Sequence, residues 1–227
     1  PVIFLSIPLM LIILQPDLGT AVLIGLSGAL VIFFAGVSWR IIFLTSFFLL
    51  SFLPVIWGTL HDYQKQRVLT FLDPQADPLG TGWNTIQSMT ALGSGGITGK
   101  GYLSGTQARL SFLPEAHTDF VAAVLGEEFG IIGLLTLIGL YLLIFFRGLT
   151  LAMRNGNNFS RVLSAALCVT FFVHVLVNLG MISGALPIVG VPLPFVSYGG
   201  TSTIALCINF GLIMALQPRS RSLVVDL

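Results

Sequence analysis

Long apolar segments with very few charges constrain this chain more than any other feature. Phe120–Phe146, Val162–Ile182 and Thr201–Leu216 are apolar over most of their length. Only 8% of the 227 residues are charged, whereas a soluble domain carries about a quarter. Backbone polar groups cannot stay unpaired in lipid, so segments of this kind cross a membrane as helices. The sequence therefore predicts an all-α polytopic membrane protein.

About six segments are apolar enough to be membrane-spanning helices, the first of them only partial. A full span needs roughly 20 apolar residues, and the first segment is shorter and begins the chain without a methionine. We therefore read residues 1–227 as one membrane domain that is part of a longer protein. Asp17 is placed to cap the second helix. The predicted segments are Val2–Leu14, Gly19–Gly36, Ile41–Gly58, Phe120–Phe146, Val162–Ile182 and Thr201–Leu216.

Residues 59–119 form the one long polar region, which we predict to be a large loop rich in turn-forming residues. A structureless loop of this length is usually functional. Trp83–Leu92 within it is a candidate for a short helix at the membrane surface. A second irregular segment, Ser183–Gly200, is rich in proline and glycine. Irregular backbone at membrane depth needs protein cover or a cavity, so we expect it to wall a cleft beside Asp119.

The arginines predict the orientation. The segments around Arg40, Arg147–Arg161 and the C-terminal tail with Arg219 and Arg221 carry positive charge, and the short connectors on the other side carry none. The positive-inside rule then places these segments and the C-terminus in the cytoplasm and the 59–119 loop outside. The net charge of only +1 argues against a nucleic-acid partner. Cys168 and Cys207 lie in apolar runs and read as core residues.

Acidic residues gather where the polar loop meets the next apolar segment. Asp119 and Glu115 are four residues apart and would share one helix face if Pro114 begins a helix. Asp119 is a candidate general base, and the alternative is a plain helix cap. We expect His117 and Arg109 to tune its pKa.

If the following helix is continuous, Asp119 lies about 12 Å above the outer boundary near Glu127. Glu127 and Glu128 themselves read as structural, paired with a neighbouring helix or a basic loop residue. Lys100 sits in a glycine-rich stretch whose backbone N–H groups and cation together suit a phosphate. For His174 and Asn178, one turn apart, interhelical hydrogen bonding is the expected role.

Five segments in order give the chain a clear resemblance: QPDLGTA at Gln15–Ala21, GSGGITGKG at Gly93–Gly101, FLPEAHTDF at Phe112–Phe120, GEEFG at Gly126–Gly130 and PLPFVSYGGTS at Pro192–Ser202. With these motifs the chain resembles the SEDS family of shape, elongation, division and sporulation proteins, over nearly its whole length. The GKGYLSGTQ version is more similar to the elongation (RodA) branch than to the division (FtsW) branch. The resemblance implies ten transmembrane helices, with this chain starting in the fifth.

The resemblance also implies an activity: a glycosyltransferase that polymerises lipid II into peptidoglycan glycan strands beside a class B penicillin-binding protein, in the bacterial cytoplasmic membrane. The essential aspartate of the family matches Asp119. Two other roles stay open, a flippase for lipid-linked precursors and a non-catalytic scaffold, as does a role in division. Arg109 or Lys100 would stabilise the departing pyrophosphate. A divalent cation (Mg²⁺ or Mn²⁺) could share this task, although no cluster of ligands in the sequence demands one. We expect substrate contacts from Lys100, Arg109, Glu115, His117, Thr118, Ser197, Gly200 and Ser202.

Overall fold

The structure is a computed structural model that describes residues 2–15, 17–38, 40–41, 43–44, 47, 51, 57–58, 62–80, 82–110 and 112–217. Every regular element in these residues is a helix, which confirms the predicted fold class. Most of the predicted span Ile41–Gly58, together with Trp39, His61 and the tail after Gln217, lies outside the described residues. The elements are α1 (Val2–Leu14), α2 (Leu18–Phe34), α5 (Asp62–Leu72), η1 (Pro74–Ala76), α6 (Trp83–Gly95), α7 (Thr106–Arg109), α8 (Val121–Met153), α9 (Asn158–Ile182) and α10 (Gly200–Ala215).

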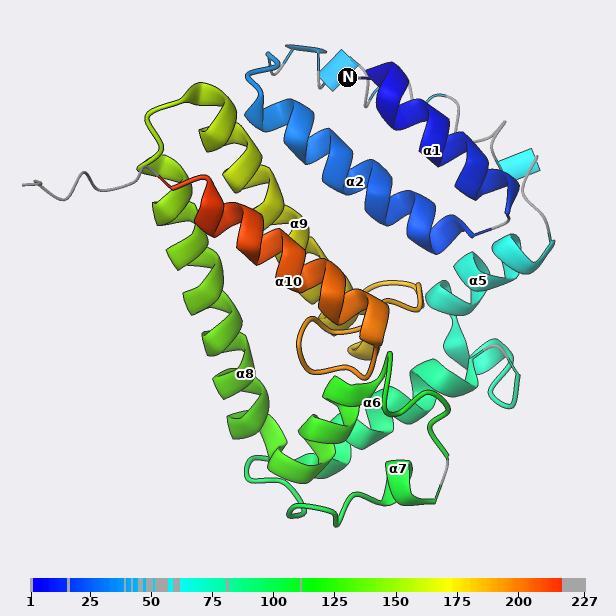
Figure 1. The fold of residues 1–227 in the computed structure, drawn as a ribbon. Helices are drawn as coiled ribbons and strands as arrows, with labels where there is room; N and C mark the ends of the chain where they lie inside the picture. The colour runs from blue at the N-terminus through cyan, green and yellow to red at the C-terminus, as the bar shows by residue number, and fades with distance from the viewer. Residues whose placement is uncertain are drawn as a thin grey trace, which may run out of the picture.

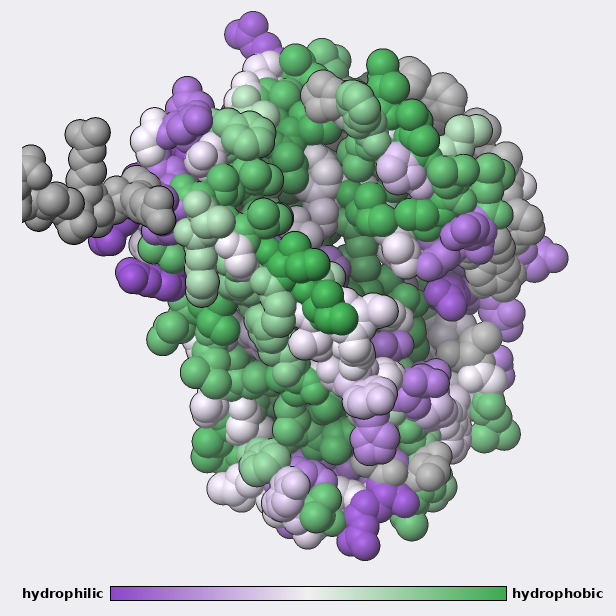
Figure 2. All heavy atoms as spheres, in the orientation of Figure 1, coloured by the Kyte–Doolittle hydropathy of each residue, from purple (hydrophilic) through white to green (hydrophobic). Residues whose placement is uncertain are grey.

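The apolar helices form a bundle of two antiparallel pairs. α1 pairs with α2, α8 pairs with α9, and α9 packs against α2, while α10 crosses in front of α9 (Figure 1). α8 and α9 are long and apolar enough to cross a membrane, and α1, α2 and α10 are shorter apolar helices. Figure 2 shows apolar side chains over much of this surface, with hydrophilic ones gathered at the α8–α9 turn and around α5 to α7. This pattern fits a helical bundle that lies in lipid and has polar ends.

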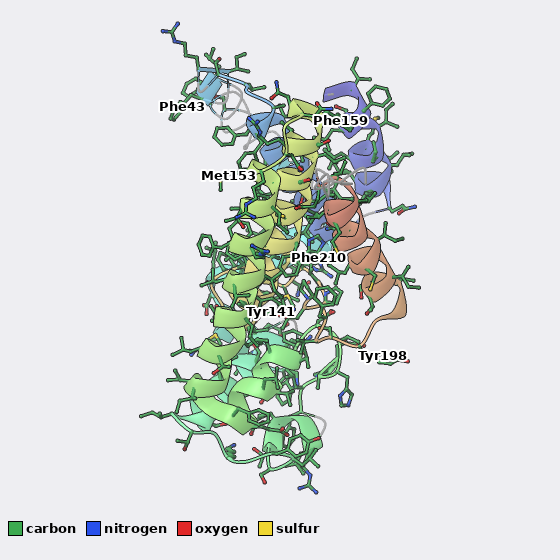
Figure 3. All side chains as sticks on the ribbon, turned by 60° about the vertical axis from the view of Figure 1, so that its left-hand side comes forward. Phe43, Tyr141, Met153, Phe159, Tyr198 and Phe210 are labelled. Atoms are coloured by element: carbon green, nitrogen blue, oxygen red, sulfur yellow. The ribbon has the colours of Figure 1, made fainter. Side chains whose placement is uncertain are left out.

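Aromatic side chains fill the centre of the bundle. Phe171 of α9 is 1% exposed and lies edge-on to Phe210 of α10, with ring centroids 5.2 Å apart. Tyr141 of α8 is also buried, and its hydroxyl donates to the Pro194 carbonyl at 2.7 Å. In Figure 3 Tyr141 and Phe210 lie within the bundle, whereas Tyr198 projects away from it. The core therefore holds one end of the irregular connector Ser183–Gly199 in place.

The long polar region is more ordered than the sequence predicts. The short helix at Trp83–Leu92 is confirmed, as α6, and extends to Gly95. The sequence does not predict the helix α5, because its first half is polar and charged. Glutamine, lysine and arginine are nevertheless good helix formers. The expectation of a largely structureless loop is therefore wrong for residues 62–72.

The helix α8 is broken at Gly130, whose backbone has φ +66° and ψ −163°. Figure 1 shows the element turning back at its lower end, so Val121–Phe129 does not continue the axis of the long apolar part. The estimate that places Asp119 about 12 Å further out along a straight helix is therefore wrong.

The glycine-rich loop 96–101 supplies the hydrogen bonds that this break removes. The N–H groups of Ile131 and Ile132, which begin the second part of α8, donate to the carbonyls of Gly96 (3.0 Å) and Ile97 (3.2 Å). The carbonyls of Glu127 and Glu128, which end the first part, accept from Lys100 (3.0 Å) and Gly101 (2.9 Å). Helix ends need such partners when they are buried. The backbone N–H groups of Lys100 and Gly101 are thus engaged within the protein, against the hypothesis that they bind phosphate.

Candidate functional site

Asp119 is the last polar residue of the turns that precede α8. Its backbone carbonyl accepts a hydrogen bond from Nδ2 of Asn178 at 2.8 Å, and the same amide donates to the Val191 carbonyl at 2.6 Å. Asn178 is completely buried in α9. A single asparagine thus ties the Asp119 turn to the connector. The expected interhelical hydrogen bond is wrong for Asn178, because both partners lie in irregular segments.

The connector contacts the segment His117–Asp119 at two further points. The hydroxyl of Ser197 donates to the Thr118 carbonyl and accepts from the Leu193 N–H at 2.7 Å. The backbone N–H of Tyr198 donates to the His117 carbonyl at 2.9 Å. Ser197 is only 8% exposed, so its side chain does not face outward. The expected position of the connector beside Asp119 is confirmed.

The Asp119 carboxylate is half-buried against the connector. Gly190 makes room for it, since a Cβ at that position would lie 3.3 Å from Oδ2. Burial raises the pKa of Asp119, and the nearby Glu115 charge raises it further. The expected tuning by His117 and Arg109 is wrong, because the shift comes from burial and from Glu115 and not from either cation.

Glu115 lies near Asp119 without sharing a helix with it. Its φ is +55°, and residues 113–119 form turns instead of the expected helix. The Glu115 carbonyl accepts from the N–H groups of Thr118 (3.1 Å) and Phe120 (3.3 Å), and its Oε2 accepts from the Thr118 hydroxyl at 2.9 Å. Pro114 begins this turn and not a helix. Glu115 is therefore a like charge beside Asp119, held by Thr118.

Two hollows flank the connector on either side of its contact with Asp119. A pocket of about 310 Å³ lies between α2, α9, α10 and the connector, lined by Gly190, His174 and Ser202 among others. The second is an open groove whose lining includes His117, Ser197 and Gly200. Asp119 lies next to the pocket through its contact with Gly190. Of the predicted substrate residues, Ser202 lines the pocket and His117, Ser197 and Gly200 line the groove, whereas Lys100, Arg109, Glu115 and Thr118 line neither hollow.

Lys100 and Arg109 are engaged away from the Asp119 carboxylate. Nζ of Lys100 contacts Oε1 of Glu127 at 2.6 Å, and Glu127 is completely buried. The same carboxylate accepts from the N–H groups of Thr106 (2.8 Å) and Gln107 (3.1 Å), which begin α7. The structural role expected for Glu127 is confirmed. Arg109 is exposed and donates to the Leu103 carbonyl at 3.1 Å.

The residues of α5 that reach the connector had no signal in the sequence beyond their charge. Arg67 lines a pocket of about 200 Å³ together with Asn84 of α6 and the connector residues Leu186, Pro187 and Ile188. A helix assignment for residues 62–72 would have placed Arg67 on a defined face. Within the described residues no three His, Cys, Asp or Glu side chains gather as metal ligands would, and the role of a divalent cation stays a prediction.

Comparison with known proteins identifies the family. Residues 1–222 match the model of the FtsW, RodA and SpoVE family, described as cell cycle proteins. The chain belongs to this family. It is 50% identical over 222 residues to the peptidoglycan glycosyltransferase MrdB of Escherichia coli K12, a match that covers 97% of this chain and 60% of MrdB. It is 36% identical to the probable peptidoglycan glycosyltransferase FtsW of Trichlorobacter lovleyi, covering 95% of this chain and 56% of that protein.

Solved structures share the fold. One, from work on the structural coordination of polymerization and crosslinking by a peptidoglycan synthase complex, has a TM-score of 0.79 at 32% identity and covers 94% of this chain and 59% of its own. An aspartate-to-alanine mutant of the Rod shape determining protein RodA from Thermus thermophilus has a TM-score of 0.61 at 27% identity, covering 94% and 54%. The chain thus spans about 60% of the length of MrdB, and the resemblance to the SEDS family is confirmed.

Proposed function

We propose that the protein to which this chain belongs is a peptidoglycan glycosyltransferase that polymerises lipid II, and that Asp119 is its general base. Family membership supports the reaction class. The observation that carries the assignment of the base is the half-buried Asp119 carboxylate with a raised pKa, on a turn whose backbone carbonyls accept hydrogen bonds from Asn178 and Ser197. A general base works best when its pKa lies nearer the working pH than that of a free carboxyl group.

The proposed step is a single displacement with inversion. The carboxylate of Asp119 takes the proton from the 4-hydroxyl of the acceptor GlcNAc, and that oxygen forms a bond to the anomeric carbon of the donor sugar. The bond from this carbon to the lipid pyrophosphate breaks, and the pyrophosphate leaves with the electron pair. The proton on Asp119 then passes to water, which restores the carboxylate.

We also propose the setting of this reaction: the bacterial cytoplasmic membrane, with residues 59–119 outside and the C-terminus in the cytoplasm, beside a class B penicillin-binding protein. The related peptidoglycan synthase complex supports the partner. A role in elongation rather than division is favoured by the identity to MrdB, 50%, against 36% to the FtsW of T. lovleyi.

Replacing Asp119 by asparagine tests the base. Asp119→Asn keeps the shape and a hydrogen-bonding oxygen but cannot accept a proton, so glycan synthesis from purified lipid II should fall by about 10²–10⁴-fold, the usual worth of general acid–base catalysis. The assay uses the full-length protein with its partner. Asp62→Asn, at an exposed acid in the first turn of α5, is the matched control and should keep the parent rate.

The outcomes separate the alternatives. A flippase would lose lipid II translocation while polymerisation by a second enzyme continues. A scaffold would lose neither activity as long as the partner stays bound. A stable Asp119→Asn complex that makes glycan strands at the parent rate would overturn the assignment of the base.

A further inference from the structure

The departing pyrophosphate needs positive charge, and the structure leaves the expected cations poorly placed. Lys100 is committed to the buried Glu127 carboxylate at 2.6 Å. Removing one partner of such a buried pair is costly, so Lys100 is not free to move to a substrate. Arg109 is exposed on α7 and donates to the Leu103 carbonyl. Another cation of the polar region is therefore a candidate for this role.

Arg67 is also exposed, but unlike Arg109 it lines a pocket beside the connector. The pocket, of about 200 Å³, is bounded by Arg67 and Thr70 of α5, Asn84 of α6 and Leu186–Ile188 of the connector. Figure 1 shows α5 on the side of the connector away from the long part of α8, and α6 below the connector, where it reaches the first turns of α8. The Arg67 guanidinium forms no ion pair within the part of the chain that the structure describes. It is near enough to Asp17 to act on that carboxylate, whose own hydrogen bonds go to Thr20.

This pocket lies close to the Asp119 carboxylate along the connector. Ile188 lines the pocket, and Gly190 lies beside the Asp119 carboxylate, since a Cβ on Gly190 would be 3.3 Å from Oδ2. Two residues of extended backbone span at most about 7 Å, which is comparable to the length of a pyrophosphate group. Between them, Val189 packs tightly on α2, where a Cβ on Gly19 would lie 2.6 Å from the Val189 side chain. The connector is thus fixed between the base and the Arg67 pocket.

We propose that the pocket between α5, α6 and the connector binds the pyrophosphate of a lipid-linked substrate, with Arg67 as its cation and the Asn84 amide as a second donor. The planar guanidinium suits phosphate oxygens because it can donate two parallel hydrogen bonds. Arg67 stays protonated throughout and transfers no proton; it stabilises the charge that the leaving group gains. This inference rests on the proposed glycosyltransferase function and replaces Lys100 and Arg109 in that role.

The test uses the full-length protein with its partner and compares Arg67→Gln, Arg67→Lys and Asn84→Asp. A hydrogen bond to a charged group is worth about tenfold to a hundredfold in binding. Arg67→Gln should weaken the inhibition of polymerisation by inorganic pyrophosphate by at least about tenfold. Arg67→Lys should lie between it and the parent, and Asn84→Asp should weaken inhibition by repulsion. Lys65→Gln, two residues away on α5 and outside the pocket, is the matched control and should change nothing.

The kinetics tell which lipid provides the pyrophosphate. If it is the leaving group of the donor, Arg67→Gln lowers kcat; if it belongs to the acceptor, the lipid II concentration for half-maximal rate rises at constant kcat. Unchanged pyrophosphate inhibition in both Arg67→Gln and Asn84→Asp would overturn the proposal. If Arg67→Gln does not assemble with its partner, the pyrophosphate inhibition of Arg67→Lys and Asn84→Asp tests the proposal instead.

The site and the base can fail separately. Competition of inorganic pyrophosphate with fluorescent lipid II for binding, measured in the Asp119→Asn background, reports on the Arg67 pocket without turnover. If Asp119→Asn polymerises at the parent rate while Arg67→Gln binds pyrophosphate more weakly, the assignment of Asp119 as the base is wrong and the Arg67 pocket is supported. If Asp119→Asn loses its polymerisation rate while Arg67→Gln binds pyrophosphate like the parent, the Arg67 pocket is rejected and the assignment of the base is supported.

Discussion

At the scale of single residues, the charge of Glu115 has a measurable consequence for the pH dependence of Asp119. The pKa of Asp119 is raised, first by burial and then by Glu115, so the carboxylate is protonated, and unable to act as a base, as pH falls through this raised pKa. Glu115→Gln removes the like charge and lowers the pKa. The acidic limb of the pH–rate profile of glycan synthesis should therefore move to lower pH.

The profile of His117→Gln separates this effect from a histidine titration. If His117 gives rise to the acidic limb, His117→Gln abolishes the limb and Glu115→Gln leaves it in place. If Asp119 gives rise to it, the limb survives in His117→Gln. If the acidic limb of the Glu115→Gln profile stays at the parent pH, the coupling between Glu115 and Asp119 is contradicted.

The residue types near the site were predictable from the sequence, whereas their partners were not. A charged residue in an apolar helix needs a partner, and Glu127 has one in Lys100. Nothing in the sequence showed that this pairing removes Lys100 from the phosphate-binding candidates. Asn178 likewise was recognised as a polar residue in an apolar helix, but its bonds to Asp119 and Val191 depend on where two irregular segments pass α9.

At the scale of elements, long apolar helices were predictable and breaks within them were not. The ends of α1 and α9 at Leu14 and Ile182 agree with the predicted segments, because an apolar run ends where polar or turn-forming residues begin. The break at Gly130 comes just after Glu127 and Glu128, inside the segment Phe120–Phe146 that the sequence predicts as one continuous helix. It exists because the loop 96–101 offers the missing hydrogen bonds, a long-range partnership that periodicity does not reveal.

The break can be tested by adding one methyl group. Gly130 has φ +66°, and a Cβ there would lie 2.4 Å from the Gly99 backbone nitrogen. Gly130→Ala should therefore destabilise the protein by more than the 1–3 kcal/mol that a strained φ costs by itself, about 3 kcal/mol or more, and should lower the thermal midpoint of the purified complex and its polymerisation rate together.

Gly139→Ala is the matched control for this substitution. Gly139 lies in the same helix α8, and a Cβ there would meet no atom within 4 Å. Alanine favours a helix over glycine by about 1 kcal/mol, so this variant should be unchanged or slightly more stable. Equal losses of stability in the two variants would show that the loop 96–101 does not depend on the Gly130 backbone.

At the scale of the whole molecule, the structure separates two polar ends. Arg154 and Arg161 lie at the turn between α8 and α9, where Arg161 donates to the Asn155 carbonyl at 3.2 Å. The helices α6 and α7 lie at the opposite end of α8 (Figure 1). Figure 3 places Met153 and Phe159 at the first end and Tyr198 towards the second. The 23 residues from Ile131 to Met153 extend about 34 Å as a helix, enough to cross the hydrocarbon core.

The positive-inside rule turns this separation into an orientation: the end with Arg154 should be cytoplasmic and the end with residues 62–119 outside. Single cysteines at Arg154 and Leu79, in a background where the exposed Cys207 is replaced by serine, test it with a membrane-impermeant thiol reagent. Leu79 is 85% exposed and is a better position than Lys100, whose ion pair with Glu127 a cysteine would break. In intact spheroplasts the reagent should label position 79 alone, and after permeabilisation both positions. Labelling of position 154 alone in the intact cells would invert the orientation and place Asp119 on the side of the membrane that peptidoglycan polymerisation cannot use.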